Sequence, residues 1–122
     1  MERVFDLLYD GPLSNNVAFG YKLKGKWETI SYEEYAFKAE CLASYFLTIG
    51  IETGTKIASI CYNRPEWNIL DMALLQIGAI HVSLYPNFNL DDFKHSIEYT
   101  YTKYVFASSK LIFDSKLNNF LL

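Results

Sequence analysis

Three polar side chains follow two apolar runs, at positions where an open α/β sheet would hold a ligand. Asn63 and Arg64 come after the run 56–62, and Tyr85 comes after the run 79–84. Such sheets bind ligands in a crevice at the carboxyl ends of their strands, which makes Asn63, Arg64 and Tyr85 candidates for lining a cleft. Bracing of the surrounding loops is the alternative role, and the sequence favours it.

No catalytic or phosphate-binding motif is present. The six glycines are scattered at positions 11, 20, 25, 50, 54 and 78 and form no Walker or Rossmann loop. The nucleophile elbow G-x-S-x-G is absent, which argues against a Ser-His-Asp hydrolase. His81 and His95 lack zinc-type spacing, so we expect structural or surface roles for both. The sequence therefore assigns no catalytic, cofactor-binding or metal-ligating residue.

Composition narrows the class of protein. The chain has 122 residues, 51% hydrophobic and 20% charged, which favours one compact unit with a buried core. A net charge of −3 gives no electrostatic reason to bind nucleic acid. No apolar run approaches the roughly 20 residues that span a bilayer, and the first residues lack the pattern of a secretory leader. We expect Cys41 and Cys61 to be small buried hydrophobes in a reducing cytosol, without a disulfide.

A hairpin and a helix are predicted in the first part of the chain. Residues 17–23 and 27–30 flank a Lys-Gly-Lys turn, which indicates a small antiparallel hairpin. Ser31 and Glu34 have the spacing of a capping box, in which each side chain would cap the other residue's amide. Gly50 is placed to end the helix. Its apolar stripe, at spacings of three and four, consists of Tyr35, Ala39, Leu42, Ala43 and Phe46.

The rest of the chain alternates strands and helices. Residues 56–62 and 79–84 are predicted to be strands buried on both faces, and residues 104–107 a third strand. Consecutive strand-helix-strand units require crossovers, so the sheet is expected to be parallel with helices on its faces. The predicted fold class is α/β: a parallel sheet flanked by helices, with a small N-terminal β-hairpin.

Three further helices connect and follow these strands. Pro65 opens the first, which is apolar on more than one face and so needs cover on more than one side. Asn89 is expected to cap the second, where Asp91-Asp92 would stabilise the helix dipole and not form a catalytic pair. Ser108 or Ser109 is expected to cap the last. The apolar stripe of the second helix consists of Leu90, Phe93, Ile97 and Tyr101.

The segment from Ile60 to Asn87 carries a family resemblance. It contains Asn63-Arg64-Pro65-Glu66-Trp67, then Gln76-Ile77-Gly78-Ala79 and Tyr85-Pro86. In that order and spacing the chain resembles the N-terminal region of the AMP-forming acyl-CoA synthetases, especially the long-chain fatty-acid members. The similarity extends from about Phe5 to about Ala107. Among the departures, Ser83 stands where that family often has proline.

The resemblance implies that residues 1–122 are an incomplete N-terminal portion of the large AMP-binding domain of an adenylate-forming ligase. The parent would convert a fatty acid, ATP and CoA to acyl-CoA, AMP and pyrophosphate through an acyl-adenylate, with Mg²⁺. The family's phosphate loop, adenine-binding segment, ribose-binding Asp and catalytic Lys do not occur in these residues. The segment is therefore expected to be scaffold, inactive by itself and cytoplasmic, with peripheral membrane association of the parent left open.

The expected partner is the remainder of the ligase chain. An incompletely covered central helix and the apolar end Phe120-Leu121-Leu122 suggest an edge where that remainder packs. A homodimer through the same apolar surface is a second expectation. The competing class is a stand-alone α/β interaction or dimerisation module, and a small independent nucleotide binder is a third reading that the missing phosphate motifs disfavour.

Overall fold

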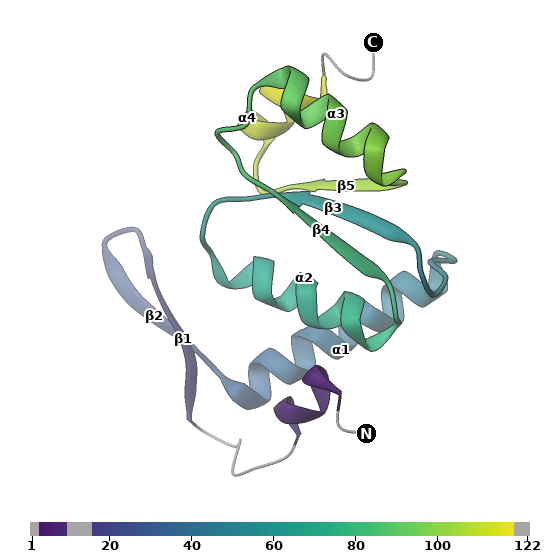
Figure 1. Ribbon diagram of the computed structural model, residues 1–122. Coiled ribbons are helices and arrows are strands. Elements are labelled where there is room, and N and C mark those ends of the chain that lie inside the picture. The colour runs from purple at the N-terminus through teal and green to yellow at the C-terminus, as the bar shows by residue number, and fades with distance from the viewer. Residues whose placement is uncertain (1–2, 10–15, 119–122) are drawn as a thin grey trace.

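Figure 1 shows the computed structural model, which describes residues 3–9 and 16–118. These residues form an antiparallel hairpin and a three-stranded parallel sheet with helices on both faces. The hairpin strands are β1 (Val17–Leu23) and β2 (Lys26–Ser31). The sheet strands are β3 (Lys56–Ile60), β4 (Ile80–Leu84) and β5 (Tyr104–Ala107). The α/β class and the hairpin predicted from the sequence are confirmed.

The helices also follow the predicted order. The α-helices are α1 (Tyr32–Thr48), α2 (Pro65–Gln76), α3 (Leu90–Thr100) and α4 (Lys110–Ile112). The short irregular helices are η1 (Val4–Leu8), a 3₁₀ helix, and η2 (Phe113–Leu117), a π-helical turn that continues α4. Of the two serines proposed as the last cap, Ser109 has that role, because its Oγ accepts a hydrogen bond from the amide of Ile112 at 3.3 Å. The predicted apolar end, Phe120-Leu121-Leu122, lies outside the described residues.

Helix α1 begins with half of the predicted capping box. The Ser31 Oγ accepts a hydrogen bond from the Glu34 amide at 3.1 Å, whereas the Glu34 carboxylate pairs with Lys38 at 2.7 Å. Gly50 follows the helix with a φ of +85°, a backbone conformation that glycine adopts without strain. The predicted stripe is buried, with Leu42 partly exposed.

The strand order in the parallel sheet is β4-β3-β5. Helix α2 connects β3 to β4 and lies with α1 on one face, whereas α3 connects β4 to β5 and lies with α4 on the other face (Figure 1). The two crossovers run in opposite directions along the sheet. Connections of one hand must then place α2 and α3 on opposite faces, as observed.

The core lies on both faces of the central strand. Ile57 faces the first helical layer and packs in one cluster with Phe46 and Leu74. Ile60 faces the second layer and packs in another cluster with Phe93. These contacts follow from the period-2 alternation of a strand that is covered on both sides. The burial of β3 predicted from its apolar run is confirmed.

Strand β4 is an edge strand, and the prediction that it is buried on both faces is wrong. Ile80, its first residue, is 47% exposed, and Leu84 is its one buried residue. It pairs with β3 on one side, and no described residue pairs with its other side. An apolar run reveals that a strand packs against helices but does not reveal its place in the strand order.

Helix α2 is covered on more than one side, as its apolar faces predict. It contacts α1, η1 and β4, and Glu66 is its one exposed residue. Six of its twelve residues are nevertheless partly exposed, so the expectation that the remainder of the chain packs against it stays a prediction. Large exposed apolar side chains lie elsewhere, including Trp27 on β2, Phe37 on α1 and Leu111 on α4.

Helix α3 keeps only half of its predicted stripe. Asn89 caps the helix as expected, its Oδ1 accepting a backbone amide hydrogen bond at 2.8 Å. Phe93 and Ile97 are buried, whereas Leu90 is 39% exposed and Tyr101 is 81% exposed. Tyr101 ends the helix with a left-handed backbone, φ +54°, so it does not follow the helical spacing that put it on the stripe.

The two cysteines are free thiols in different environments. Cys61 is half-buried just after β3 and donates a hydrogen bond from its Sγ to the Tyr62 carbonyl oxygen at 2.9 Å. Cys41 is exposed on α1, so the expectation that both cysteines are buried is wrong for this one.

Candidate functional site

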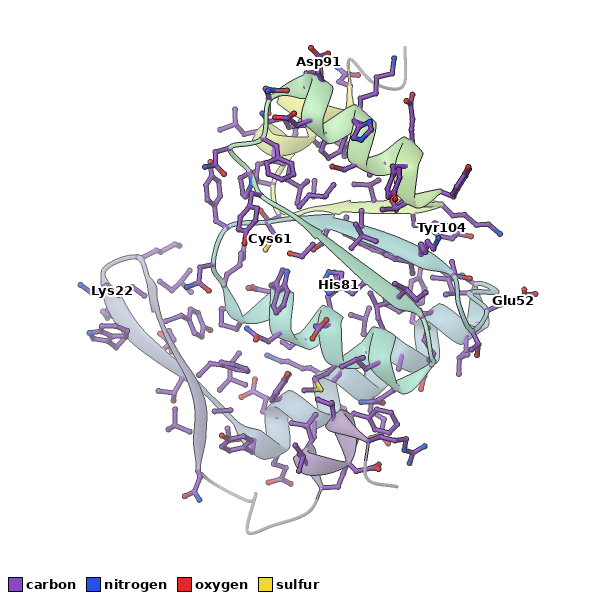
Figure 2. The ribbon with its side chains drawn as sticks, viewed as in Figure 1. Lys22, Glu52, Cys61, His81, Asp91 and Tyr104 are labelled. Carbon is purple, nitrogen blue, oxygen red and sulfur yellow. The ribbon has the colours of Figure 1, made fainter. Side chains whose placement is uncertain are left out.

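A cavity of about 260 Å³ lies where β3 and β5 end. The helix after β3 goes to one face of the sheet and the helix after β5 goes to the other, and this divergence opens a crevice between the two strands. Leu42 of α1, Leu70 of α2 and Phe106 of β5 form apolar walls. Figure 2 shows Cys61 at this end of the sheet and Tyr104 at the opposite end of β5.

Arg64 lies on the rim of this cavity with its guanidinium already engaged. Its Nε and Nη2 each donate to a carboxylate oxygen of Glu66 at 2.9 Å, and its Nη1 donates to the Ser108 carbonyl oxygen at 3.2 Å. The hydrogen bond from Arg64 lowers the pKa of Glu66, against the opposing effect of burial. Arg64 therefore ties the β3–α2 loop to the end of β5 while it lines the cavity.

Asn63 and Tyr85 lie elsewhere. Asn63 is exposed and lines a second hollow of about 590 Å³ between β1 and the start of α2, which Arg64 also borders. Tyr85 is 68% exposed and lines a third hollow of about 410 Å³ with Phe88, their rings 5.7 Å apart. The structure thus brings Asn63 and Arg64 together and separates Tyr85 from them, because β4 lies on the far side of β3 from the β5 crevice.

A chain of three hydrogen-bonded side chains lies between the sheet and α2. The side chain of His81 on β4 is 6% exposed, and its Nδ1 is 2.7 Å from the Asp71 Oδ1 on α2. Its Nε2 is 2.7 Å from the Oγ of Ser59, a buried residue of β3 that also lines the cavity. Figure 2 shows His81 in the layer between β4 and α2.

The atoms joined are those of a Ser-His-Asp hydrolase, yet their setting differs. Since a carboxylate only accepts hydrogen bonds, the Nδ1 of His81 donates to Asp71, and its Nε2 lies within hydrogen-bonding distance of the Ser59 hydroxyl. Ser59, however, is 1% exposed and sits within a strand, not on a sharp strand-to-helix turn that presents the hydroxyl to a substrate. The arrangement satisfies three buried or half-buried polar groups and links β3, β4 and α2.

Sequence reasoning missed this hydrogen-bonded chain, although a signal for it existed. Residues two apart along a strand share a face, so Ser59, His81 and Ser83 face the same helix from two paired strands. On the side toward these residues, that helix carries the carboxylate of Asp71 and the indole of Trp67. The Trp67 Nε1 donates to the Ser83 Oγ at 3.1 Å, and the Trp67 ring lies 5.2 Å from the His81 ring.

The cavity is suited to an apolar group and not to a phosphate. Burial raises the pKa of the Cys61 thiol, which disfavours the nucleophilic thiolate. The Arg64 guanidinium on the rim is paired with the Glu66 carboxylate, which would repel an anion. Among the residues that the structure describes, no group of three or more His, Cys, Asp or Glu side chains could hold a metal ion.

Comparison with known proteins gives one family. Residues 12–120 match the family model described as "AMP-binding enzyme". The long-chain-fatty-acid–CoA ligase ACSBG1 of Rattus norvegicus is 37% identical over 71 residues, which are 58% of this chain and 10% of that protein. The long-chain-fatty-acid–CoA ligase FadD15 of Mycobacterium bovis is 24% identical over 106 residues, 87% of this chain and 17% of that protein. The chain thus spans about a tenth of the length of the ACSBG1 relatives it matches.

Solved structures share the fold. A putative long-chain-fatty-acid CoA ligase from Rhodopseudomonas palustris superposes with a TM-score of 0.80 and 24% identity, over 97% of this chain and 30% of that one. The structure of IdnL1 also superposes with a TM-score of 0.80, at 16% identity, over 88% of this chain and 22% of that one. At these identities the likeness establishes the fold alone.

Proposed function

The chain belongs to the family of AMP-binding enzymes, and on that premise we propose that it is the N-terminal part of a long-chain fatty-acid CoA ligase. The observation that carries this proposal is the family match over residues 12–120 combined with 37% identity to a ligase of that specificity. The parent would convert a fatty acid, ATP and CoA to acyl-CoA, AMP and pyrophosphate, with Mg²⁺. Residues 1–122 would be an incomplete portion of its AMP-binding domain.

The residues of the β3–β5 cavity do not fit the triphosphate of ATP. Phosphate binding needs converging backbone amides or free cations, whereas Arg64 is already held by Glu66 and Ser108. The cavity of about 260 Å³ also lies below the roughly 300 Å³ at which ordinary ligand pockets begin. We therefore assign ATP, Mg²⁺ and CoA to the parent and derive no step of the reaction through these residues.

A scaffold role accounts for the polar groups that line the cavity. Arg64 joins the β3–α2 loop to the end of β5, and His81 joins β4 to both β3 and α2. The Arg64–Ser108 contact spans 44 residues and the Ser59–His81 contact spans 22, whereas the His81–Asp71 contact joins neighbouring elements. We assign Asn63 and Arg64 to bracing of the loop that leads into α2, and we assign Tyr85 to the separate hollow beside α3.

The location of the parent follows from the same proposal. No helix in the described part of the chain is long and apolar enough to cross a bilayer. Both thiols are free, which suits a reducing compartment. We propose a cytoplasmic parent that meets its fatty-acid substrate at a membrane surface.

The decisive experiment reads the transcript beyond codon 122 and assays its products. We expect a downstream phosphate loop, and we expect the longer chain to form radiolabelled acyl-CoA from palmitate, ATP and CoA. The 122-residue chain, assayed at equal concentration, should give no turnover above the no-enzyme control. Acyl-CoA formation by the 122-residue chain itself would overturn the scaffold assignment.

The competing function is a stand-alone interaction or dimerisation module. The exposed apolar side chains of β2 and α1, such as Trp27 at 72% and Phe37 at 63%, favour it. A natural stop after codon 122, together with a dimer by sedimentation at micromolar concentration, would replace the ligase proposal with this one.

A further inference from the structure

The tip of the hairpin, residues 22–27, concentrates positive charge. Its sequence is Lys-Leu-Lys-Gly-Lys-Trp, so three lysines lie close together in a chain whose net charge is −3. Every residue of the tip is exposed, and no carboxylate in the described part of the chain lies within ion-pairing distance of these lysines. The Lys22 ammonium lies 5.6 Å from the centre of the Trp27 ring. All three charges are therefore available to an anionic partner.

The tip is also apolar on both of its faces. Trp27 is 72% exposed and Leu23 is 53% exposed. Across the hairpin Trp27 pairs with Lys22, and Leu23 pairs with Lys26. Residues directly opposite share a face and successive residues alternate, so each face carries one large apolar side chain and one lysine. A hollow of about 590 Å³ lies between β1 and the start of α2, and Figure 1 shows the hairpin projecting beside it.

The turn places the third lysine at the outer end of the hairpin. Lys24 and Gly25 form a two-residue turn with φ values of +49° and +82°, the signs of a type I′ turn. Asparagine, aspartate and glycine are the usual residues at the first of these positions, and lysine stands there instead. Figure 2 shows Lys22 beside this turn, far from the parallel sheet. The tip is thus a short, tightly turned projection that carries its charges outward.

This arrangement suits a lipid surface better than the face of a protein. Tryptophan rings favour the level of the lipid headgroups, and lysine stems lie along apolar surface while their ammonium groups reach the phosphates. Anionic lipids attract lysines that come near the bilayer. A protein face would cover one side of the hairpin, whereas a headgroup layer surrounds an inserted tip and covers Leu23 and Trp27 together.

We propose that the tip of the β1–β2 hairpin binds an anionic lipid bilayer, with Leu23 and Trp27 inserted among the headgroups and the three lysines at the phosphates. Glu28, the nearest acidic residue along the chain, pairs with Tyr21 one position further from the turn and leaves the tip with an excess of positive charge. So small an apolar area gives reversible binding and not a permanent anchor. The inference rests on the proposed function, because it brings the ligase to the bilayer that holds its fatty-acid substrate.

Vesicle flotation tests the role of the lysines. The 122-residue chain is mixed with vesicles of phosphatidylcholine alone or with about 30% phosphatidylserine, and we expect binding only to the anionic vesicles. Added salt should weaken that binding, because it screens exposed charges. Failure of the unsubstituted chain to bind the anionic vesicles would overturn the inference.

A matched pair of charge reversals locates the binding surface. Combining Lys22→Glu, Lys24→Glu and Lys26→Glu should lower the partition coefficient about a hundredfold or more. The control combines Lys94→Glu, Lys103→Glu and Lys110→Glu, three exposed sites away from the hairpin, and has the same net charge. The control should lose less than about threefold, since its substitutions lie away from the proposed contact. Equal losses would assign the binding to overall charge and overturn the inference.

Two apolar substitutions test insertion. Trp27→Ala should weaken binding about tenfold, whereas Phe37→Ala, at a site 63% exposed on α1, should leave it unchanged. Brominated lipids should quench the tryptophan fluorescence of the unsubstituted chain and not that of Trp27→Ala, which retains Trp67. Binding that needs the lysines but not Trp27 would indicate a surface for an acidic protein and overturn the inference. The ligase proposal is read separately, from the transcript and the acyl-CoA assay, whichever result the vesicles give.

Discussion

The imidazole of His81 and the carboxylate of Asp71 lie 2.7 Å apart, between a strand and the helix that precedes it in the chain. Residues 77–79 connect α2 to β4 through the backbone, and the Asp71–His81 contact joins the same two elements through their side chains. His81 is 6% exposed on its side chain and Asp71 is 30% exposed, so the pair is partly shielded from water.

We expect Asp71→Ala to lower the free energy of unfolding by about 1–3 kcal/mol, because it leaves the buried Nδ1 of His81 without its partner. Urea denaturation followed by circular dichroism measures the change. Asp114→Ala removes an exposed helical carboxylate and is the matched control. Its free energy of unfolding should lie within about 0.5 kcal/mol of that of the unsubstituted chain. Equal effects of the two substitutions would show that the Asp71–His81 contact contributes nothing to stability.

The Arg64–Glu66 pair should make a small, pH-dependent contribution to stability. The pKa of Glu66 is lowered from its ordinary value of 4.5, first by the hydrogen bond from Arg64. A carboxyl group whose pKa is lowered in the folded state stabilises the protein at pH values above its ordinary pKa. That stabilisation is lost as the pH falls through the folded-state pKa. Because both side chains are largely exposed, we expect Glu66→Gln to cost only about 0.2–1 kcal/mol at pH 7.

The measurement is urea unfolding of both proteins between pH 7 and pH 3. The difference in free energy of unfolding between the unsubstituted chain and Glu66→Gln should shrink as the pH falls below 4.5. Glu98→Gln is the control, since Glu98 lies 4.0 Å from Lys94 in a looser pair, and it should have a smaller effect at pH 7. A difference that is constant with pH would exclude the ion pair as its source.

Tyr35 should limit stability in alkali. Burial, with smaller effects of Asp71 and Tyr32, raises the pKa of Tyr35 to about 12. A raised folded-state pKa contributes stability below the ordinary value of 10.0, and that contribution is lost as the pH rises from there through 12. Tyr35→Phe loses the hydrogen bond from the hydroxyl to the Asn68 carbonyl oxygen, 3.1 Å, so it should cost about 0.5–1.5 kcal/mol at pH 8.

Thermal unfolding between pH 8 and pH 11.5 tests this dependence. The difference in stability between Tyr35→Phe and the unsubstituted chain should narrow above pH 10. The unsubstituted chain loses stability as Tyr35 deprotonates, whereas phenylalanine has no proton to lose. Tyr99→Phe, at a site 77% exposed, is the control. Its stability should match that of the unsubstituted chain at every pH in this range. A gap that widens with pH would contradict the assigned direction.

Gly78 should tolerate no side chain. Its φ is +70°, and a Cβ would lie 2.9 Å from the Thr53 Cγ2. Thr53 is held in place because its Oγ1 donates to the Ile77 carbonyl oxygen at 3.1 Å. We expect Gly78→Ala to lower the free energy of unfolding by about 2–4 kcal/mol, because backbone strain and steric overlap with Thr53 add together.

Gly50→Ala separates those two causes. Gly50 has a φ of +85° with open space around it, so its substitution should cost only the backbone strain, about 1 kcal/mol. Chemical denaturation of both variants gives the comparison. If Gly50→Ala were the more damaging substitution, the contact with Thr53 would not be the reason that glycine is needed at position 78.

Local signals in the sequence determined the order of the elements. The lysine-glycine turn of the hairpin, the cap at Ser31, Pro65 at the start of α2 and the apolar run of β3 each act within a few residues. Such signals work through backbone geometry and side-chain periodicity, which do not depend on the rest of the fold. They sufficed for the α/β class and the parallel sheet. The AMP-binding family was indicated instead by a resemblance in the motifs at 63–67, 76–79 and 85–86.

Only the tertiary structure decided which groups meet. Strand order made β4 an edge and left Ile80 exposed, and it separated Tyr85 from Arg64 although both follow strands. The contact of Ser59 with His81 spans 22 residues, and that of Arg64 with Ser108 spans 44. Pairing over such distances depends on how strands and helices pack in space, which spacing along the chain does not encode.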